Sequence, residues 1–588
     1  MEKWYVQAKR ADFFAIGKKF GIDPVIARII RNRNIVGEQA IQEYLYGGID
    51  LLHDPYQLKD AELAVEILIQ KKKEQKKIRI ISDYDVDGVI SNYILWTAFH
   101  RCGFDADFRI PDRVADGYGI NERLIEQAKA DGIDTIITCD NGIAAIPQIA
   151  YGKQLGLTII VTDHHDIPYE MTENGKQYLH SQADAIVNPK QPECSYPYDK
   201  LCGAVVAMKV AQILYDKMGF SKEAYEEFIP YAAIATVCDI VDLTGENRAL
   251  VKIGLQQLPD LSNPGLQALL EVNGLAGRKI SSYHLGFVIG PCINATGRLE
   301  SAEQAVSLLL EQDILKARAT AQKLKNLNEE RKSMTEDGVR MGFQMVEEQG
   351  LDKEDVLVVL LNDCHESLAG IIAGRIKEHY YKPTIVLTET EHGLVKGSGR
   401  SIEGYHMFEK LNEVKDLLIK FGGHPMAAGM TLQKTDVEEF RRRLNEHSKL
   451  TQEELTRKIS IDVPMPIDYI HMDLIHELDL LEPFGKENPK PLFAEKDLHI
   501  ISARKIGKKQ NMLKMRLQNA GGATMDALLF QGVEQLEELL IKKYGKDAVV
   551  RMYSSRSNPI RISCTYYPNI NEYQGRQTIQ VVIQNYLV

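Results

Sequence analysis

The sequence predicts an α/β protein with a parallel sheet in its first large domain, a second α/β domain, and a small β-rich module at the C-terminal end. Runs of β-branched residues alternate with helical patterns from about Lys77 to Asp260, which is typical of parallel strands joined by crossover helices. A long helical stretch follows, from about Ser301 to Gly350. Beyond about residue 450, clustered prolines and alternating strands replace this pattern, which favours a barrel of OB type.

The length of 588 residues and the apolar content of 44% exceed what one hydrophobic core accommodates. An Asp-Pro pair at Asp23 and Pro24 marks a helix start within the first segment. We therefore expect five segments: an N-terminal helical cap (1–50), a first α/β domain (51–265), a helical linker (266–350), a second α/β domain (351–450) and an OB-like barrel (451–588).

Composition restricts the compartment and the class of protein. No apolar run approaches the roughly 20 residues that span a bilayer, and the first residues have no signal-peptide pattern, so we expect a cytoplasmic protein without a membrane partner. The eight cysteines are scattered without a CxxC pair, which indicates reduced thiols and argues against zinc.

Charge is unevenly distributed along the chain. The net charge is −11, yet residues 501–588 carry 13 Lys and Arg against 6 Asp and Glu. A basic module on an acidic body can hold a polyanion, although charge alone does not identify DNA. Single lysines there can equally be solvated, and the tyrosines can belong to the core; the basic and aromatic residues in question are Arg504, Lys505, Lys508, Lys509, Lys514, Arg516, Tyr553, Tyr566, Tyr567 and Tyr573.

Three acids follow the first predicted strand of the sheet. The run Ile78–Ser82 leads into Asp83, Asp85 and Asp87, and Gly88 then opens an apolar helical stretch. Open α/β sheets place their ligands at the carboxyl ends of strands. Because three crowded carboxylates repel one another, a cation is expected among them, and oxygen ligands favour magnesium or manganese.

Two further strands and one helix end in the same way. One strand ends at Asp140, the next runs into Asp163-His164-His165, and an apolar helix ends at Asp239. Parallel strands share one carboxyl edge, so we expect these groups to converge into a site for two divalent ions, with Asp140 suited to bridge them. The expected ligands are Asp83, Asp85, Asp87, Asp140, His164 and Asp239, with His165 either a ligand or a support.

These motifs resemble those of the DHH phosphoesterase family in order, spacing and residue type. The resemblance continues along the chain, with segments such as 294–299, 365–370, 397–401 and 422–429 similar to the branch of that family that degrades single-stranded DNA. It implies a DHH domain and a DHH-associated domain facing each other across a cleft, joined by a long helix. It also implies His424 facing the scissile phosphate, and Arg113, Ser398 and Arg400 holding a 5′ phosphate. Arg298 is left open between substrate contact and a structural salt bridge.

The sequence thus predicts a single-stranded-DNA exonuclease, with 5′-to-3′ polarity implied by resemblance and a role in DNA repair and recombination. We expect two Mn or Mg ions, single-stranded DNA as the partner, a helicase and a single-strand-binding protein as associates, and a monomer. The alternatives are an oligonucleotide or cyclic-dinucleotide phosphodiesterase and a non-catalytic single-strand-binding scaffold. Three positions depart from the family pattern: Cys292, Cys364 and Glu487 stand where arginine, tryptophan and glycine are common.

Overall fold

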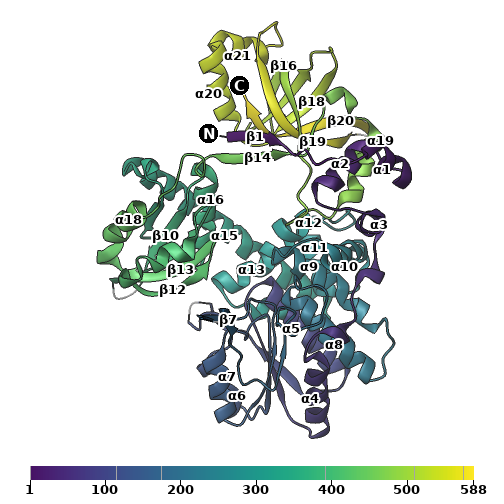
Figure 1. The fold of residues 1–588 in the computed structure, drawn as a ribbon, viewed down its shortest axis with the longest axis vertical. Helices are drawn as coiled ribbons and strands as arrows, with labels where there is room; N and C mark the ends of the chain where they lie inside the picture. The colour runs from purple at the N-terminus through teal and green to yellow at the C-terminus, as the bar shows by residue number, and fades with distance from the viewer. Residues whose placement is uncertain (1, 114, 174, 391–392, 509, 574) are drawn as a thin grey trace. The chain divides into compact units, whose positions relative to one another are not determined.

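The computed structural model describes residues 2–113, 115–173, 175–390, 393–508, 510–573 and 575–588. The chain forms two compact units: residues 48–457 make one, and residues 1–47 together with 458–588 make the other. Each is described by itself (Figure 1). Within the described residues, no helix is both long and apolar enough to cross a membrane.

A five-stranded parallel sheet forms the first part of the larger unit, as the sequence predicts. The strand order is β3-β2-β4-β5-β8, and the carboxyl ends of the three central strands are in register, with Ser82 opposite Cys139 and Cys139 opposite Thr162. The elements are α4 (Ala61–Lys73), β2 (Ile78–Ser82), α5 (Val86–Arg101), β3 (Ala106–Arg109), α6 (Glu122–Ala130), β4 (Thr135–Cys139), α7 (Ile146–Gln154), β5 (Thr158–Thr162), β6 (Tyr169–Thr172), β7 (Gly175–Tyr178), β8 (Ala185–Val187), α8 (Gly203–Lys217), α9 (Ile229–Cys238) and α10 (Gly245–Gln257).

Both faces of this sheet are covered, because successive strand residues point to opposite faces. Ile137 and Ile160 pack into one core with α4, α5, α8 and α9, whereas Ile136 and Ile159 pack into a second core with α6 and α7. The three central strands are therefore buried along almost their whole length, and polar groups gather where the strands end.

Helices connect this sheet to the second α/β domain. They are α11 (Pro264–Val272), α12 (Ser282–His284), a π-helical turn (Leu285–Ile289), α13 (Gly290–Leu299), α14 (Glu303–Leu310) and α15 (Ile314–Glu348). The 35-residue α15 is the long helix that the sequence predicts.

The second α/β domain has a mixed sheet of order β12-β13-β11-β10-β9, in which β9 and β10 are parallel and the other pairs are antiparallel. Its elements are β9 (Leu357–Leu361), α16 (Ala369–Tyr380), β10 (Thr384–Glu389), β11 (Leu394–Arg400), α17 (Met407–Asn412), β12 (Leu418–His424), β13 (Ala427–Gln433) and α18 (Val437–Glu446).

The smaller unit contains a closed barrel of the predicted type. Strands β16, β17, β18, β20 and β19 pair in that order, and β16 also pairs with β19, which closes the ring. The elements are β1 (Glu2–Val6), α1 (Phe13–Phe20), α2 (Pro24–Asn32), α3 (Glu38–Tyr46), β14 (Arg457–Ile461), β15 (Val463–Pro464), α19 (Met472–Leu478), β16 (Phe493–Ile506), β17 (Met512–Gln518), β18 (Thr524–Leu529), α20 (Val533–Tyr544), α21 (Lys546–Tyr553), β19 (Arg561–Tyr573) and β20 (Arg576–Leu587).

The N-terminal helices belong to the core of this barrel unit. Asp23 caps α2 by accepting a hydrogen bond from the Val25 amide, as its Asp-Pro sequence indicates. Ile26, Ile29 and Ile30 are fully buried in the same cluster as the apolar residues of the barrel. Residues 1–47 therefore lie with the C-terminal barrel, which the sequence pattern did not reveal.

Close helix packing holds the second α/β domain on the connector. A Cβ atom at Gly338 or Gly342 of α15 would come within 2.4 or 2.6 Å of the Cδ1 atom of Ile372 or Ile376 on α16. The two glycines thus allow α16 to lie directly against α15.

We predict that Gly338→Val lowers the free energy of unfolding by about 2 kcal/mol, because the added side chain overpacks the contact with Ile372. The matched change Gly374→Val, at a helical position where a Cβ meets nothing within 4 Å, is expected to stay within about 0.5 kcal/mol of the parent. Urea unfolding followed by circular dichroism measures both. Equal losses in the two variants would contradict close α15–α16 packing.

Candidate metal centre and phosphate cavity

The carboxyl edge of the parallel sheet collects the predicted acids and histidines. Asp83, Asp140 and Asp163 each come directly after the last residue of a strand, and the in-register strand ends bring them together. Asp140 has a left-handed backbone with φ of +60°, a conformation that Asp tolerates better than most residues. The convergence expected from the sequence is therefore confirmed.

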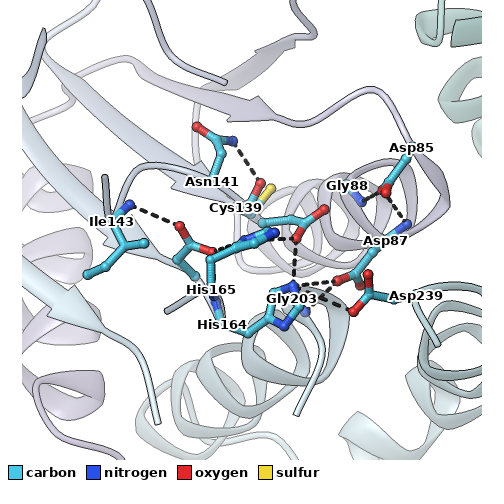
Figure 2. A network of polar contacts seen from close by, with 12 residues as sticks. Asp85, Asp87, Gly88, Cys139, Asn141, Ile143, His164, His165, Gly203 and Asp239 are labelled. Carbon is cyan, nitrogen blue, oxygen red and sulfur yellow. Dashed lines mark hydrogen bonds and ion pairs between the residues drawn. The ribbon is translucent and has the colours of Figure 1, made fainter. Parts of the chain in front are cut away.

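The side chains form overlapping groups whose ligand atoms lie within 4.8 Å of one another. One group is Asp83, Asp85 and Asp140, a second is Asp87, His164 and Asp239, and a third is Asp140, Asp163, His164 and His165. His164 Nε2 lies 3.1 Å from Asp140 Oδ1 and 3.6 Å from both Asp87 Oδ2 and Asp239 Oδ2 (Figure 2). Asp140 belongs to the first and third groups and lies beside His164 of the second, so its carboxylate is the one best placed to be shared.

The electrostatics of the cluster call for positive charge. Burial raises the pKa of Asp83, Asp140 and Asp239 well above the usual range for Asp, and neighbouring carboxylates raise it further. Burial also lowers the pKa of His164, which favours the neutral imidazole. Among the described residues, Asp83 Oδ1, Asp140 Oδ1 and His164 Nε2 are buried without a hydrogen-bond partner. Such orphaned atoms on carboxylate and imidazole groups fit divalent cations.

Backbone amides hold Asp85 and Asp87 in place. Asp85 Oδ1 accepts hydrogen bonds from the amides of Asp87 and Gly88, so it caps α5. Asp87 accepts from the amides of Gly203 and Ala204 at 2.6 and 2.8 Å, at the N-terminus of α8 (Figure 2). Gly203 is required there, since a Cβ would lie 2.7 Å from Asp140 Cβ and 3.0 Å from Asp87 Oδ2.

Asp163 positions the two histidines with which it shares one of these groups. Its Oδ1 accepts from the amides of His164 and His165 and lies 2.7 Å from His165 Nδ1, while Oδ2 accepts from the Ile143 amide. Although burial alone would raise it, the hydrogen bond from His165 and the two imidazoles bring the pKa of Asp163 to about 2. This pairing orients His165, of which 41% of the side chain is exposed, towards the open side of the cluster.

Sequence reasoning assigned no role to several residues that complete this edge. The Tyr118 hydroxyl donates to the Asp140 carbonyl at 3.1 Å, and its ring meets His165 edge-on. Asn294 Oδ1 accepts from the Val86 amide, directly after Asp85. Gly117 and Gly119, on either side of Tyr118, are the sequence signal that marks the position of Tyr118.

A cavity of about 480 Å³ lies within the larger unit between residues of the parallel-sheet domain and the second α/β domain. Arg113, whose guanidinium lies 4.7 Å from the centre of the Tyr84 ring, lines it from one domain. Ser398 and Arg400 line it from β11, with Arg400 Nη1 donating to Ser398 Oγ at 2.8 Å. The other lining residues are Tyr84, Arg298, Glu366, Ser367, Gly370, Ile371, Lys396, Gly397, Lys420, Phe421, Gly422, Gly429, Met430 and Thr431.

The cations of this cavity are buried close to one another. Burial, together with the positive charges of Arg113 and Arg331, lowers the pKa of Arg298 to about 10. Burial and Arg113 likewise lower the pKa of Arg400. An anion bound between these guanidiniums relieves their repulsion, so the cavity suits a phosphate group.

The structure separates the roles open for Arg298 and His424. Arg298 Nη1 donates to the Ser367 carbonyl at 2.7 Å, so it joins the two domains and also lines the cavity. His424 is exposed at the end of β12 and does not line the cavity. The pKa of Asp166 is lowered mainly by Lys190, against the effect of burial, and His424 adds a smaller lowering effect. His424 therefore lies near the segment that carries His165.

The departures from the family pattern have local explanations. Cys292 is buried beside Asn328 and Asn273 and contributes no cation to the cavity. Cys364 is half-buried near the α15–α16 contact. Glu487 has a left-handed backbone with φ of +57°, the conformation for which glycine is favoured.

The basic and aromatic residues of the barrel fall into two classes. Lys514 and Arg516 both pair with Asp526, and Lys505 pairs with Glu537. Tyr566 and Tyr567 are buried in the core, so the structural role left open for the tyrosines applies to these two. Lys509 and the side chain of Tyr573 lie outside what the structure describes.

Family models match three parts of the chain. The N-terminal domain of the DHH family matches residues 77–237, the DHHA1 domain matches residues 353–449, and the RecJ OB domain matches residues 461–585. These spans contain the parallel sheet, the mixed sheet and the closed barrel.

Curated relatives resemble the chain over nearly its whole length. The single-stranded-DNA-specific exonuclease RecJ of Bacillus subtilis is 34% identical over 99% of this chain and 70% of its own length. The RecJ of Escherichia coli is 30% identical over 96% of both chains. Among solved structures, RecJ of Thermus thermophilus in complex with Mn²⁺ has a TM-score of 0.80 at 25% identity, covering 100% of this chain and 79% of its own. An exonuclease RecJ bound to manganese has a TM-score of 0.58 at 30% identity, covering 68% of this chain and 96% of its own.

We predict that Gly203→Ala weakens divalent-metal affinity by about 10-fold to 100-fold, the range for losing a support of metal ligands. The added methyl group must push Asp87 and Asp140 from their positions. Titration with Mn²⁺ followed by calorimetry measures the change, and Gly374→Ala serves as the matched control. Parent-like affinity in Gly203→Ala would mean that the tight fit around Gly203 does not hold these carboxylates.

Proposed function

Because the chain belongs to the RecJ family of single-stranded-DNA-specific exonucleases, we propose that it degrades single-stranded DNA by metal-dependent hydrolysis of terminal phosphodiester bonds. The observation that supports this most directly is the pairing of two features in one unit. A cluster of buried acids with orphaned ligand atoms lies in the same domain as Arg113 of the arginine-rich cavity. Such a pair can hold a terminal phosphate while the next ester bond is cleaved.

In this proposal, Asp83, Asp85 and Asp140 hold one divalent cation, and Asp87, Asp140, His164 and Asp239 hold the other. The donor set of oxygens and one imidazole suits Mn²⁺ or Mg²⁺. Bound divalent cations supply Lewis-acid stabilisation of the phosphoryl oxygens and acidify water. The residues of the chain do the rest: Asp163 fixes the histidines, Gly203 and Ala204 fix Asp87, and His165 and His424 contact the substrate from the two domains.

The cavity supports the 5′-to-3′ polarity. A 5′-terminal phosphate carries more negative charge than an internal one and exposes more oxygens to bidentate guanidinium donors. Arg113, Ser398 and Arg400 surround a space of that kind. We therefore propose that the 5′ phosphate binds there and that Arg298 contributes charge while holding the two domains together. Manganese-dependent digestion of strands labelled at either end tests this: shortening must begin at the 5′ end.

The other candidate functions account for fewer features. A dinucleotide phosphodiesterase needs no barrel, whereas this chain carries one that matches the RecJ OB domain. A non-catalytic scaffold has no use for buried acids with raised pKa values. The same end-label assay excludes both if strands of many lengths are shortened stepwise.

Three associated assignments extend the proposal. We propose a cytoplasmic enzyme, since the eight described cysteines are all free. We propose that it works as a monomer, because the metal ligands and the cavity all come from residues 48–457 of one chain. A helicase that opens duplex DNA, and a single-strand-binding protein that keeps it open, would supply the substrate for repair and recombination.

We predict that Asp140→Asn reduces hydrolysis by at least about 1,000-fold, because the central oxygen of the two ligand groups loses its charge. Asn tolerates the left-handed backbone of this position. Removing one of several repelling carboxylates should also raise the melting temperature of the metal-free protein. Parent-like turnover would contradict the shared-ligand assignment, and a lower melting temperature would contradict the repulsion.

We predict that a variant limited to residues 48–457 still cleaves short oligonucleotides but binds long strands more weakly, with a smaller salt dependence of the binding constant. Both 1–47 and 458–588 are removed because the two segments share one core. Filter binding at several salt concentrations measures the slope. An unchanged slope would mean that the barrel unit does not contact the DNA backbone.

A further inference from the structure

An exposed pair of aromatic rings lies on the helix that connects the sheet domain to the cavity. Tyr283 and Phe287 are 62% and 65% exposed. Their ring centroids are 5.0 Å apart with 24° between the planes, so the two rings stack. Single exposed apolar residues are common on protein surfaces, but two large rings stacked in solvent present a flat apolar surface, and the Tyr283 ring also meets His284 edge-on.

The local backbone sets this pair apart. Phe287 belongs to the π-helical turn Leu285–Ile289, inside a continuous helix that runs from Ser282 to Leu299. Single π-turns within helices occur frequently at functional sites. Ile240, which follows Asp239, is 66% exposed and has φ of +58°, a conformation that is strained for a β-branched residue.

This helix touches the metal centre along its length. Cys238, which precedes Asp239, donates through its thiol to the Leu285 carbonyl at 3.5 Å. Asn294 accepts from the Val86 amide, directly after Asp85. At the far end, Arg298 lines the phosphate cavity. One helix thus carries the aromatic pair, contacts two of the ligand-bearing loops, and ends in the cavity.

The helix also sets a spacing. The 11 residues from Phe287 to Arg298 span roughly 16 Å at about 1.5 Å per residue. That length corresponds to about five nucleotides stacked at about 3.4 Å each, and to fewer in an extended strand. A strand whose terminal phosphate lies in the cavity, and which follows this helix past the acids, reaches the aromatic pair within its first few nucleotides.

We propose that Tyr283 and Phe287 form a stacking platform for an unpaired base of the single strand, about two to five nucleotides from the phosphate in the cavity. This inference rests on the proposed function. Positive charge nearby fits a nucleic-acid occupant: Arg278 lies close enough to His284 to help lower its pKa, after the larger effect of burial. Every base has an aromatic face, so such a platform holds DNA without reading its sequence.

The test uses the full-length protein in EDTA, so that DNA is bound and not cleaved. Strands of about 20 nucleotides with a 5′ phosphate carry one abasic site, moved stepwise from the 5′ end. The parent protein should lose about 10-fold in affinity when the abasic site reaches the platform, the usual size of one stacking contact. Tyr283→Ala/Phe287→Ala should bind intact strands about 10-fold more weakly and show no position dependence at that site.

Two controls accompany this scan. Tyr283→Phe/Phe287→Tyr keeps both rings and should restore the position dependence. Leu315→Ala removes a 70% exposed apolar side chain from the start of α15 and should leave the scan as in the parent. In a separate measurement, the fluorescence of Phe287→Trp should be quenched by unlabelled poly(dT).

The proposal is overturned if the double-alanine variant binds intact strands like the parent, or if it retains the same positional loss. It is also overturned if the variant changes the oligomeric state by light scattering without changing affinity, which would assign the pair to contact with a second copy. Hydrolysis is scored separately with Mn²⁺. If the parent protein cleaves DNA stepwise but its affinity does not depend on the position of the abasic site, only this inference is wrong. If the affinity depends on that position but no DNA is cleaved, the proposed function is wrong.

Discussion

Electrostatic repulsion among carboxylates at one sheet edge is the constraint on which the rest of this structure depends. Two unit charges about 4 Å apart repel by about 4 kcal/mol at an effective dielectric constant of 20, and the ligand atoms here lie within 4.8 Å of one another. Several such pairs approach the whole net stability of a domain, which is about 5–15 kcal/mol. The fold must therefore hold these groups against their own charge until cations are bound, and it does so from several sides.

The supports share a simple physical basis. Asp85 and Asp87 each accept two backbone amides, at the N-termini of α5 and α8, where unpaired N–H groups favour negative charge. Asp163 is satisfied by three amides and an imidazole, and it orients the two histidines. The atoms left without such partners are those directed at the expected ions. The site thus holds its supporting oxygens with hydrogen bonds and leaves other ligand atoms without one, an arrangement that suits a metal ion.

The parallel sheet and its convergent acids could be predicted from sequence because both rest on local patterns. A strand followed by an acid places that acid at the carboxyl edge whichever helices cover the sheet. The register of the strands then brings the acids of neighbouring strands together. Gly203 could not be identified in this way, since its importance comes from a contact with Asp140 that is distant in sequence. The burial of residues 1–47 in the barrel core could not be predicted for the same reason, because it also depends on contacts distant in sequence. The apolar pattern of a helix shows which face is buried but not which domain covers it. The pairing of Lys514 and Arg516 with Asp526 likewise depends on strand register, so a count of basic residues overstated the free charge of the barrel.

The acidic edge of the sheet and the arginine-rich cavity lie on different elements, and the helix Ser282–Leu299 contacts both. In the proposed function, the acids hold the cations that act on a phosphodiester, so selectivity comes from the groups that position the strand. Arg298 makes one end of that helix part of the cavity, and its bond to Ser367 fixes the second domain at the same point. Asn294 and Cys238 fix the middle of the helix to the ligand loops. Because these contacts lie on one continuous helix, the proposed binding of a terminal phosphate in the cavity would place it at a distance from the acids that helix geometry sets. In the proposed function, such an arrangement favours the release of units of constant length from strands of any sequence.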